Sequence, residues 1–242
     1  VTMLSFIQRT RNNTMSDKIQ TVKINQLSRF YDVAGEKVRA LDGVSLSISP
    51  GEFIGLIGRS GSGKTTLLNL IAGLDRSSEG DIYFKGVNIS DKSEDQLALF
   101  RRQEIGIIFQ SSALLPLLTA YENIELPLRI AKISREERET RSYEVLDLVG
   151  MGHRAKHRPY ELSGGEQQRI AIARAIVANP SVILADEPTG ELDSVTAQRI
   201  FKLFRKLTDD RNISIIAATH DRGIIDTVDR VIELRDGKIL LS

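Results

Sequence analysis

Short apolar runs separated by helix-like segments are the main pattern along this chain. Runs of this length without polar alternation are typical of strands buried on both faces of a parallel sheet. The four runs lie at residues 53–57, 105–109, 182–185 and 213–219. Residues 65–72 and 164–178 instead place leucine, isoleucine, valine and alanine at helical spacing. Alternation of the two kinds of segment predicts an α/β core of mostly parallel strands.

The first third of the chain departs from that pattern. Residues 19–90 carry strand-like segments separated by turns, which predicts an antiparallel β-subdomain. The turn signals are Asp42-Gly43, Pro50-Gly51 and Lys85-Gly86. Residues from about 94 to 160 are largely helical, and Asp236-Gly237 predicts a final hairpin. We therefore expect one domain over residues 19–242, with a helical subdomain inserted at about 94–160.

A glycine-rich loop follows the first apolar run and leads into a helix. Its spacing is G-x-x-x-x-G-K-T, the pattern of a phosphate-binding P-loop. The residues expected to bind ATP here are Gly58, Arg59, Ser60, Gly61, Ser62, Gly63, Lys64, Thr65 and Thr66. Glycines let backbone N–H groups approach phosphate oxygens, and the helix N-terminus adds its dipole. We expect Lys64 to reach the β- and γ-phosphates and Thr65 to ligate Mg²⁺.

Polar residues end three of the other apolar runs. Asp186 and Glu187 follow one run, Gln110 follows a second, and His220 follows a third. Because ligands of open parallel sheets bind at the carboxyl ends of the strands, we expect Asp186 to hold Mg²⁺ and Glu187 to activate a water. Gln110 could offer its carbonyl oxygen to the same ion. An acidic turn, a structural histidine and an ordinary surface glutamine are the alternative interpretations.

A second anion-binding pattern lies far along the chain. Ser163, Gly164, Gly165 and Glu166 precede a helix, and Ser163 with Glu166 forms a capping box. Capping explains the serine and the glutamate without a ligand, but it does not explain two glycines, which cost backbone entropy. Since one chain has one P-loop, we expect this helix end to bind nucleotide held by a second copy of the chain.

Composition excludes several classes of protein. The chain has 242 residues, no cysteine and a formal net charge of +1, so neither a disulfide framework nor electrostatic nucleic-acid binding is indicated. No apolar run approaches the roughly 20 residues that span a bilayer. A role in membrane transport would therefore need a separate membrane protein as partner. We expect residues 1–18 to form a disordered leader, with Met15 as a candidate initiator.

Taken in their order along the chain, these motifs resemble those of the ATP-binding-cassette (ABC) ATPases. The resemblance extends from about Ile19 to Leu241. The resemblance implies a P-loop NTPase (RecA-like) core and a homodimer that sandwiches two ATP with Mg²⁺. It implies that His220 is a catalytic switch residue and that Asp193 contacts the second copy's nucleotide. It also places Tyr31 against adenine, although a core-facing Tyr31 and a stacking role for the adjacent Phe30 remain open.

A finer similarity is to the ATPase subunits of the MacB and LolD group, with the division ATPase FtsE close by. The stretches that carry it are residues 111–118, 122–128, 166–169 and 188–194. Glu191 departs from the asparagine more usual there. The similarity implies a membrane permease partner, possible involvement of a periplasmic adaptor, and a place on the cytoplasmic face of the membrane.

Function beyond ATP hydrolysis is then expected to be export or extraction of a lipoprotein, lipid, peptide or drug. The alternative is FtsE-like regulation of a membrane partner without transport. Residues 114–118 and 126–128 are apolar segments broken by proline. They are either core of the helical insertion or part of a groove for a coupling helix of the permease.

Overall fold

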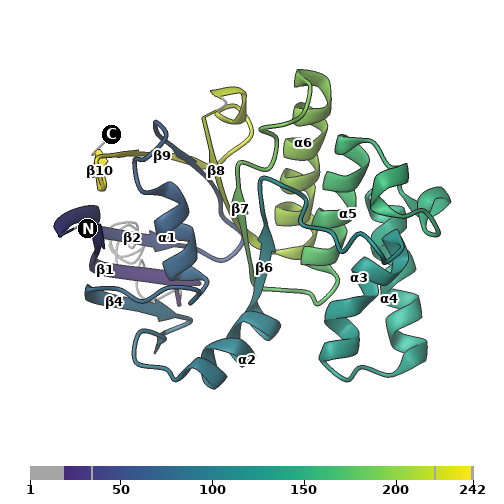
Figure 1. The fold of residues 1–242 in the computed structure, drawn as a ribbon, viewed down its shortest axis with the longest axis horizontal. Helices are drawn as coiled ribbons and strands as arrows, with labels where there is room; N and C mark the ends of the chain where they lie inside the picture. The colour runs from purple at the N-terminus through teal and green to yellow at the C-terminus, as the bar shows by residue number, and fades with distance from the viewer. Residues whose placement is uncertain (1–18, 34, 221, 241–242) are drawn as a thin grey trace, which may run out of the picture.

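A six-stranded sheet forms the centre of the molecule (Figure 1). The computed structural model describes residues 19–33, 35–220 and 222–240. The strand order is β10-β9-β3-β8-β7-β6, and only β10 runs antiparallel to its neighbour. The strands are β3 (Phe53–Ile57), β6 (Ile105–Ile108), β7 (Val182–Asp186), β8 (Ser214–Thr219), β9 (Arg230–Arg235) and β10 (Lys238–Leu240). The predicted apolar runs thus become adjacent strands, and β8 is buried along its whole length.

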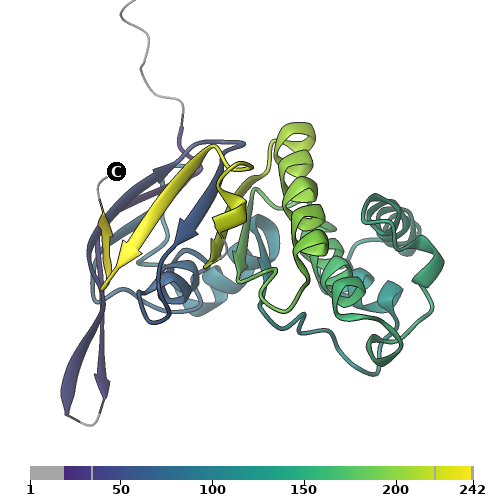
Figure 2. The same ribbon diagram turned by 90° about the horizontal axis from the view of Figure 1, so that it is seen from above.

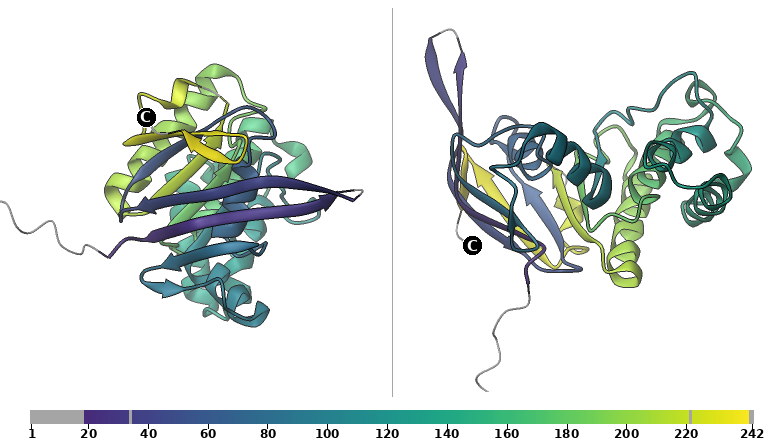
Figure 3. Two further views of the ribbon diagram at one scale, coloured as in Figure 1. Left: turned by 90° about the vertical axis from the view of Figure 1, so that its left-hand side faces the viewer. Right: turned by 90° about the horizontal axis from the view of Figure 1, so that it is seen from below.

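A smaller antiparallel sheet packs beside the first, in the order β2-β1-β4-β5. Its strands are β1 (Val22–Val33), β2 (Glu36–Ile48), β4 (Glu79–Phe84) and β5 (Val87–Asn88). β1 and β2 extend beyond the rest of the sheet as a long hairpin, which Figure 3 shows from two sides. The predicted antiparallel subdomain is therefore present.

Helix α1 (Lys64–Ile71) lies between the two sheets. Its Leu67 and Ile71 are fully buried in a cluster that joins side chains of β1, β2 and β4 to side chains of β3, β7 and β8. The opposite face of the parallel sheet is covered by a second cluster, to which α5 (Gly164–Ile176) and α6 (Ser194–Arg211) contribute (Figure 2). The helices that follow the two glycine-rich loops therefore lie on opposite faces of one sheet.

The helical subdomain begins later in the chain than expected. Helix α2 (Glu94–Glu104) buries Leu97 and Phe100 in the cluster around α1, and β6 belongs to the parallel sheet. Residues 94–108 are thus part of the core, and the predicted start at about 94 is wrong. Periodicity could not show this, because a helix against a sheet and a helix in an insertion have the same spacing. The later helices are α3 (Ala120–Ile130), α4 (Arg135–Leu148), and the short turns η2 (Gly152–Arg154) and η3 (Pro159–Glu161).

The hairpin predicted at Asp236-Gly237 is present in the structure. Asp236 and Gly237 have φ angles of 46° and 76° and connect β9 to β10, as a two-residue hairpin requires. Within the described ranges, no helix combines the length and apolar character needed to cross a bilayer. The predicted leader, including Met15, lies outside the described residues.

Candidate active site

Four strands deliver polar residues to one edge of the parallel sheet. Register explains why: Ile57 of β3 pairs with Thr219 of β8, and Asp186 of β7 pairs with Ala218. The P-loop therefore begins where His220 and Glu187 also leave the sheet. Of the predicted residues, the structure brings together in contact Lys64, Thr65, Asp186, Glu187 and His220.

Close backbone approach explains two of the P-loop glycines. A Cβ at Gly58 would lie 2.3 Å from the carbonyl oxygen of Leu234, and one at Gly63 would lie 2.4 Å from that of Ala40. Gly63 also has a φ of 102°, which side chains other than glycine rarely allow. Gly63 is the N-cap of α1, so the loop ends at the N-terminus of that helix, where the helix dipole favours an anion.

Lys64 is held over the loop by two carbonyl groups and by Glu187. Its Nζ donates to the carbonyl oxygens of Gly58 at 2.9 Å and Arg59 at 3.4 Å, and it lies 3.6 Å from Oε1 of Glu187. The side chain is only 8% exposed. A nearly buried ammonium bound mainly by neutral carbonyls is well placed to exchange them for phosphate oxygens, since charged hydrogen bonds are the stronger ones.

Thr65 and Asp186 form the oxygen-rich part of the site. The Thr65 hydroxyl donates to Oδ2 of Asp186 at 2.7 Å, while Oδ1 of Asp186 is buried without a hydrogen-bond partner among the described residues. Burial raises the pKa of Asp186, and the negative charge of Glu187 adds to this, whereas Thr65 and Lys64 act in the opposite direction. A buried carboxylate oxygen without a donor fits a hard cation, because Mg²⁺ binds hydroxyl and carboxylate oxygens together with water and phosphate.

Glu187 occupies a strained backbone position. Its φ of 46° is unusual for a residue with a side chain, and its N–H donates to the carbonyl of Ala218 at 2.8 Å. This conformation directs the carboxylate between Lys64 and the Nδ1 of His220, which lies 2.9 Å from Oε2 of Glu187. Backbone strain of this kind concentrates at functional sites. The contact between Lys64 and Glu187 has no signal in the sequence, where 123 positions separate the two residues.

Gln110 lies at the side of this cluster. A Cβ placed on Gly190 would be 3.6 Å from Nε2 of Gln110 and 3.6 Å from Cβ of Glu187. Beside it, a hollow of about 280 Å³ extends from Thr65 and Asp186 to the exposed Phe109 and Leu74. Gln110 is therefore near Gly190 and Glu187, and its role as a metal ligand stays a prediction.

The Ser163 segment has the predicted capping box. Ser163 N–H donates to Oε2 of Glu166 at 2.8 Å, and Glu166 N–H donates to Oγ of Ser163 at 3.3 Å. The backbone hydrogen bond from Ser163 lowers the pKa of Glu166. Arg154 donates to the second oxygen, Oε1 of Glu166, at 3.2 Å. Sequence reasoning missed Arg154, because an arginine twelve residues before its partner has no local signature.

The two glycines after Ser163 differ in their surroundings. A Cβ at Gly164 would meet nothing within 4 Å, whereas one at Gly165 would lie 2.9 Å from Cγ2 of Thr196. Thr196 also donates its hydroxyl to Asp193, and this bond lowers the pKa of Asp193, the N-cap of α6. The Ser163 segment and Asp193 therefore lie side by side, with open space above Gly164.

Tyr31 has partners within its own chain. Its hydroxyl donates to Oδ2 of Asp75 at 2.6 Å, and the guanidinium carbon of Arg29 lies 4.4 Å from the ring centroid. Phe30 lies near two other cations, Lys37 at 5.1 Å and Arg39 at 5.5 Å. Both rings sit on the projecting hairpin, and stacking of Tyr31 on adenine stays a prediction.

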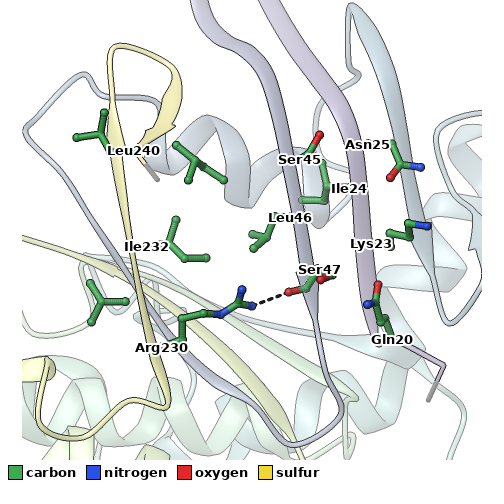
Figure 4. Close-up of a pocket in the computed structure, with 12 residues that line it drawn as sticks. Gln20, Lys23, Ile24, Asn25, Ser45, Leu46, Ser47, Arg230, Ile232 and Leu240 are labelled. Atoms are coloured by element: carbon green, nitrogen blue, oxygen red, sulfur yellow. Dashed lines mark hydrogen bonds between the residues drawn. The ribbon is translucent and has the colours of Figure 1, made fainter. Parts of the chain in front are cut away.

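A larger groove lies between the two sheets at the β9 side (Figure 4). Its volume is about 450 Å³, and Arg230 reaches across it to donate to the carbonyl of Ser47 at 2.6 Å. Arg230 also donates to Glu52 at 2.9 Å. Arg230 is thus already paired within the chain. None of the predicted site residues lines this groove.

Comparison with known proteins agrees with this geometry. The ABC transporter family model matches residues 41–190. The chain belongs to the ABC transporter family. A dimeric structure of the ATP-binding cassette MJ0796 in a post-hydrolysis state, bound to ADP and Pi, superposes with a TM-score of 0.85 at 43% identity, covering 91% of this chain and 97% of the other. The predicted cassette fold and ATPase activity are confirmed.

Two relatives illustrate the subgroup within the ABC transporter family. The chain is 43% identical over 228 residues to the lipoprotein-releasing system ATP-binding protein LolD of Francisella tularensis subsp. holarctica, covering 94% of this chain and 98% of that protein. It is 43% identical over 220 residues to the macrolide export ATP-binding/permease protein MacB of Rhodopirellula baltica. That match covers 90% of this chain but 32% of MacB, so this ABC chain spans about a third of that relative.

Proposed function

We propose that this ABC ATPase is the energising subunit of a transporter of the MacB and LolD type, acting as a homodimer on a separate membrane permease. The observation that carries the proposal is the convergence of Lys64, Asp186 and Glu187 at the end of the parallel sheet, while the helix that follows Ser163 packs on the face of the sheet opposite to α1. Two phosphate-binding helix ends on opposite faces of one sheet suit a head-to-tail pair.

Hydrolysis of ATP in this arrangement depends on side chains already in place. Lys64 and the N–H groups of the P-loop would hold the β- and γ-phosphates and offset the charge that develops on them. Glu187 would orient a water and accept its proton as the water oxygen bonds to the γ-phosphorus and the bond to the ADP oxygen breaks. His220, in contact with Glu187, would fix the direction of that carboxylate.

Thr65 and Asp186 are the residues that would hold Mg²⁺, with Gln110 beside them. When bound, Mg²⁺ would neutralise part of the negative charge of the phosphates. The Oδ1 of Asp186, which has no hydrogen-bond partner among the described residues, supports this assignment, because a buried carboxylate oxygen needs a partner.

The second copy would complete each site with Ser163, Gly164, Gly165, Glu166 and Asp193. Open space above Gly164 supports this, since a phosphate brought by another chain needs access to the helix end. The similarity to the dimeric MJ0796 cassette is the comparison that favours it.

A permease would dock near Gln110, on the cytoplasmic face of the membrane. Large apolar side chains are exposed there: Leu74, Phe109, Leu115 and Leu117. Leu128, by contrast, is 1% exposed and belongs to the core of the helical subdomain. The likeness to LolD and MacB favours export or extraction of a lipoprotein, lipid, peptide or drug, and a periplasmic adaptor is a further partner to test.

Mixing two inactive variants tests the shared sites. Lys64→Ala disables the P-loop of one chain, and Ser163→Arg blocks the capping segment of the other. In a head-to-tail dimer of the two, one site combines both defects and the other has neither, so mixing should restore part of the phosphate release. Activity that stays absent in the mixture, while each variant still binds to the unsubstituted chain, would rule out shared sites.

Capture of the membrane partner tests the transport assignment. Tagged Glu187→Gln protein is held with ATP in the native host, the membranes are solubilised, and co-purifying proteins are identified by mass spectrometry. A permease with a large extracytoplasmic domain supports the proposal. A complex with a cell-wall hydrolase would instead establish the regulatory role of the FtsE type.

A further inference from the structure

The end of α5 that is proposed to meet a phosphate already carries a carboxylate of its own. Glu166 lies in the first turn of α5, and its Oε2 accepts the N–H of Ser163 at 2.8 Å. The backbone hydrogen bond from Ser163 lowers the pKa of Glu166, so the side chain is negatively charged at neutral pH. It uses the same helix dipole that would attract an incoming phosphate, and two anions at one helix end repel each other.

Arg154 is the cation beside this carboxylate. Its Nε donates to Oε1 of Glu166 at 3.2 Å, and this is the one ion pair that the described part of the chain provides for Glu166. Asp193 is a second carboxylate nearby, because Thr196, which donates its hydroxyl to Asp193, packs against Gly165. Without Arg154, the negative charge of Glu166 would therefore add to that of Asp193.

A histidine fixes the position of Arg154. Nη1 of Arg154 lies 3.1 Å from Nε2 of His157, and since an arginine only donates, Nε2 is the acceptor and carries no proton. The carbonyl oxygen of His157 in turn accepts the N–H of Ala120, the first residue of α3, at 2.7 Å. The guanidinium is thus held between Glu166 and a residue bonded to α3, which keeps it at the end of α5 in the single chain.

We propose that Arg154 is a positioning residue that balances the charge of Glu166, so that residues 163–166 can accept the phosphate of a nucleotide held by a second copy. This inference rests on the proposed function, in which these residues complete the site of the other chain. It adds a cation of the helical subdomain to the groups that determine how tightly the two copies bind. The net charge of the pair, rather than the hydrogen bond within it, then sets the strength of ATP-driven dimerisation.

Four combinations of the pair provide the test, in chains that also carry Glu187→Gln to prevent turnover. The unsubstituted pair and the double variant of Arg154→Gln with Glu166→Gln have no net charge. Arg154→Gln alone leaves one negative charge, and Glu166→Gln alone leaves one positive charge. Glutamine still accepts the N–H of Ser163, so the capping box is kept. The measured quantities are the dimer dissociation constant with ATP by sedimentation at two salt concentrations, the ATP affinity of the dilute monomer, and the thermal midpoint.

Arg141→Gln is the matched control. Arg141 pairs with Glu137 on α4, and its side chain is 37% exposed, as is that of Arg154. It lines a hollow together with residues 176–179, which lie at the other end of α5, about 20 Å along the axis from Ser163. The substitution therefore removes the same charge from the same subdomain, at a distance from the proposed phosphate position.

We expect the dimer to be weakest in Arg154→Gln, tightest in Glu166→Gln, and equally stable in the double variant and the unsubstituted pair. A charge at a helix end changes affinity by about threefold to tenfold per site, and the dimer contains two sites, so each step should change the dissociation constant by about ten- to hundredfold. The steps should shrink at high salt, because ions screen exposed charges. Arg154→Lys should keep most of the affinity and Arg141→Gln all of it, with monomer ATP affinity within about twofold throughout.

Three results would overturn the inference. The double variant could dimerise as weakly as Arg154→Gln, Glu166→Gln could weaken the dimer, or Arg141→Gln could cause the same loss as Arg154→Gln. The first would show that the hydrogen-bonded geometry of the pair matters and its charge does not. If Arg154→Gln does not fold, the direction of the change in Glu166→Gln decides the matter. Failure of the chain with Glu187→Gln alone to dimerise with ATP would instead overturn the proposed function itself.

Discussion

Two regions of the molecule each contain a helix N-terminus. The P-loop edge consists of residues 58–66 with Asp186 and Glu187, and the Ser163 segment consists of residues 163–166. They differ in how their polar groups are hydrogen-bonded. At the P-loop edge, Ser62 Oγ and Asp186 Oδ1 are buried without partners in the described structure, and Glu187 is strained. At the Ser163 segment, the capping box and Arg154 satisfy Ser163 and Glu166 within the chain.

This difference separates a site that is incomplete without its ligand from a surface that is complete without one. Unpaired buried atoms cost free energy that a bound ligand can recover, which agrees with the proposed binding of nucleotide at the P-loop edge. The side chains of Ser163 and Glu166 have no such cost, and the distinguishing feature of their surroundings is the open space above Gly164. A surface of that kind fits a ligand that arrives on another molecule.

The largest expected effect is on the P-loop side, in Glu187→Gln. The amide keeps the shape of the side chain but cannot accept a proton, so ATP turnover should fall by about 10²–10⁴-fold. ATP binding should persist, because Lys64 and the loop are untouched. Phosphate release measures the first quantity and nucleotide titration the second. Turnover close to that of the unsubstituted chain would remove Glu187 from the catalytic role.

Gly164→Leu addresses the open surface of the Ser163 segment. No atom lies within 4 Å of the added Cβ, so the monomer should keep its fold and its ATP affinity. Turnover should fall by about tenfold or more, because a bulky side chain would block the close approach of a partner nucleotide. Phosphate release and circular dichroism provide the readouts. An active Gly164→Leu chain would show that nothing docks there.

Gly165→Ala is the matched change one residue further on, and its effect should be on stability. The new methyl group would lie 2.9 Å from Cγ2 of Thr196, which is overpacking and should cost about 1–3 kcal/mol. Adding Thr196→Ser removes that methyl group and keeps the hydroxyl that Asp193 accepts. The double variant should recover most of the loss in urea unfolding. Equal stability of Gly164→Ala and Gly165→Ala would contradict the difference in packing.

The smallest expected effect is a gain of stability in Asp186→Asn. Because the pKa of Asp186 is raised by burial, its charged form destabilises the nucleotide-free protein. Asparagine removes that charge and still accepts from Thr65, so Tm of the nucleotide-free protein at neutral pH should rise by a few degrees. The gain should shrink as pH falls from the raised pKa of Asp186 toward the ordinary carboxyl range. Calorimetry that shows a lower Tm at neutral pH would refute this account.

Much of the fold followed from local pattern. Apolar runs predicted buried strands, and Asp236-Gly237 predicted the last hairpin, because sheet burial and turn geometry restrict residue type directly. Helix α2 was assigned to the wrong subdomain, since Leu97 and Phe100 identify an apolar face but not the surface that covers it.

Short residue patterns were enough to predict the candidate site: the loop at Gly58, the carboxylates at Asp186 and Glu187, and the capping box at Ser163. These depend on residue types at short spacing, where covalent geometry leaves few alternatives. The three-dimensional fold was needed to show which of them meet, as in the contacts of Glu187 with Lys64 and His220 and the hydrogen bond from Arg174 to the carbonyl of Ala113. Such contacts join distant parts of the chain, and the sheet register that creates them is set by packing of the whole core.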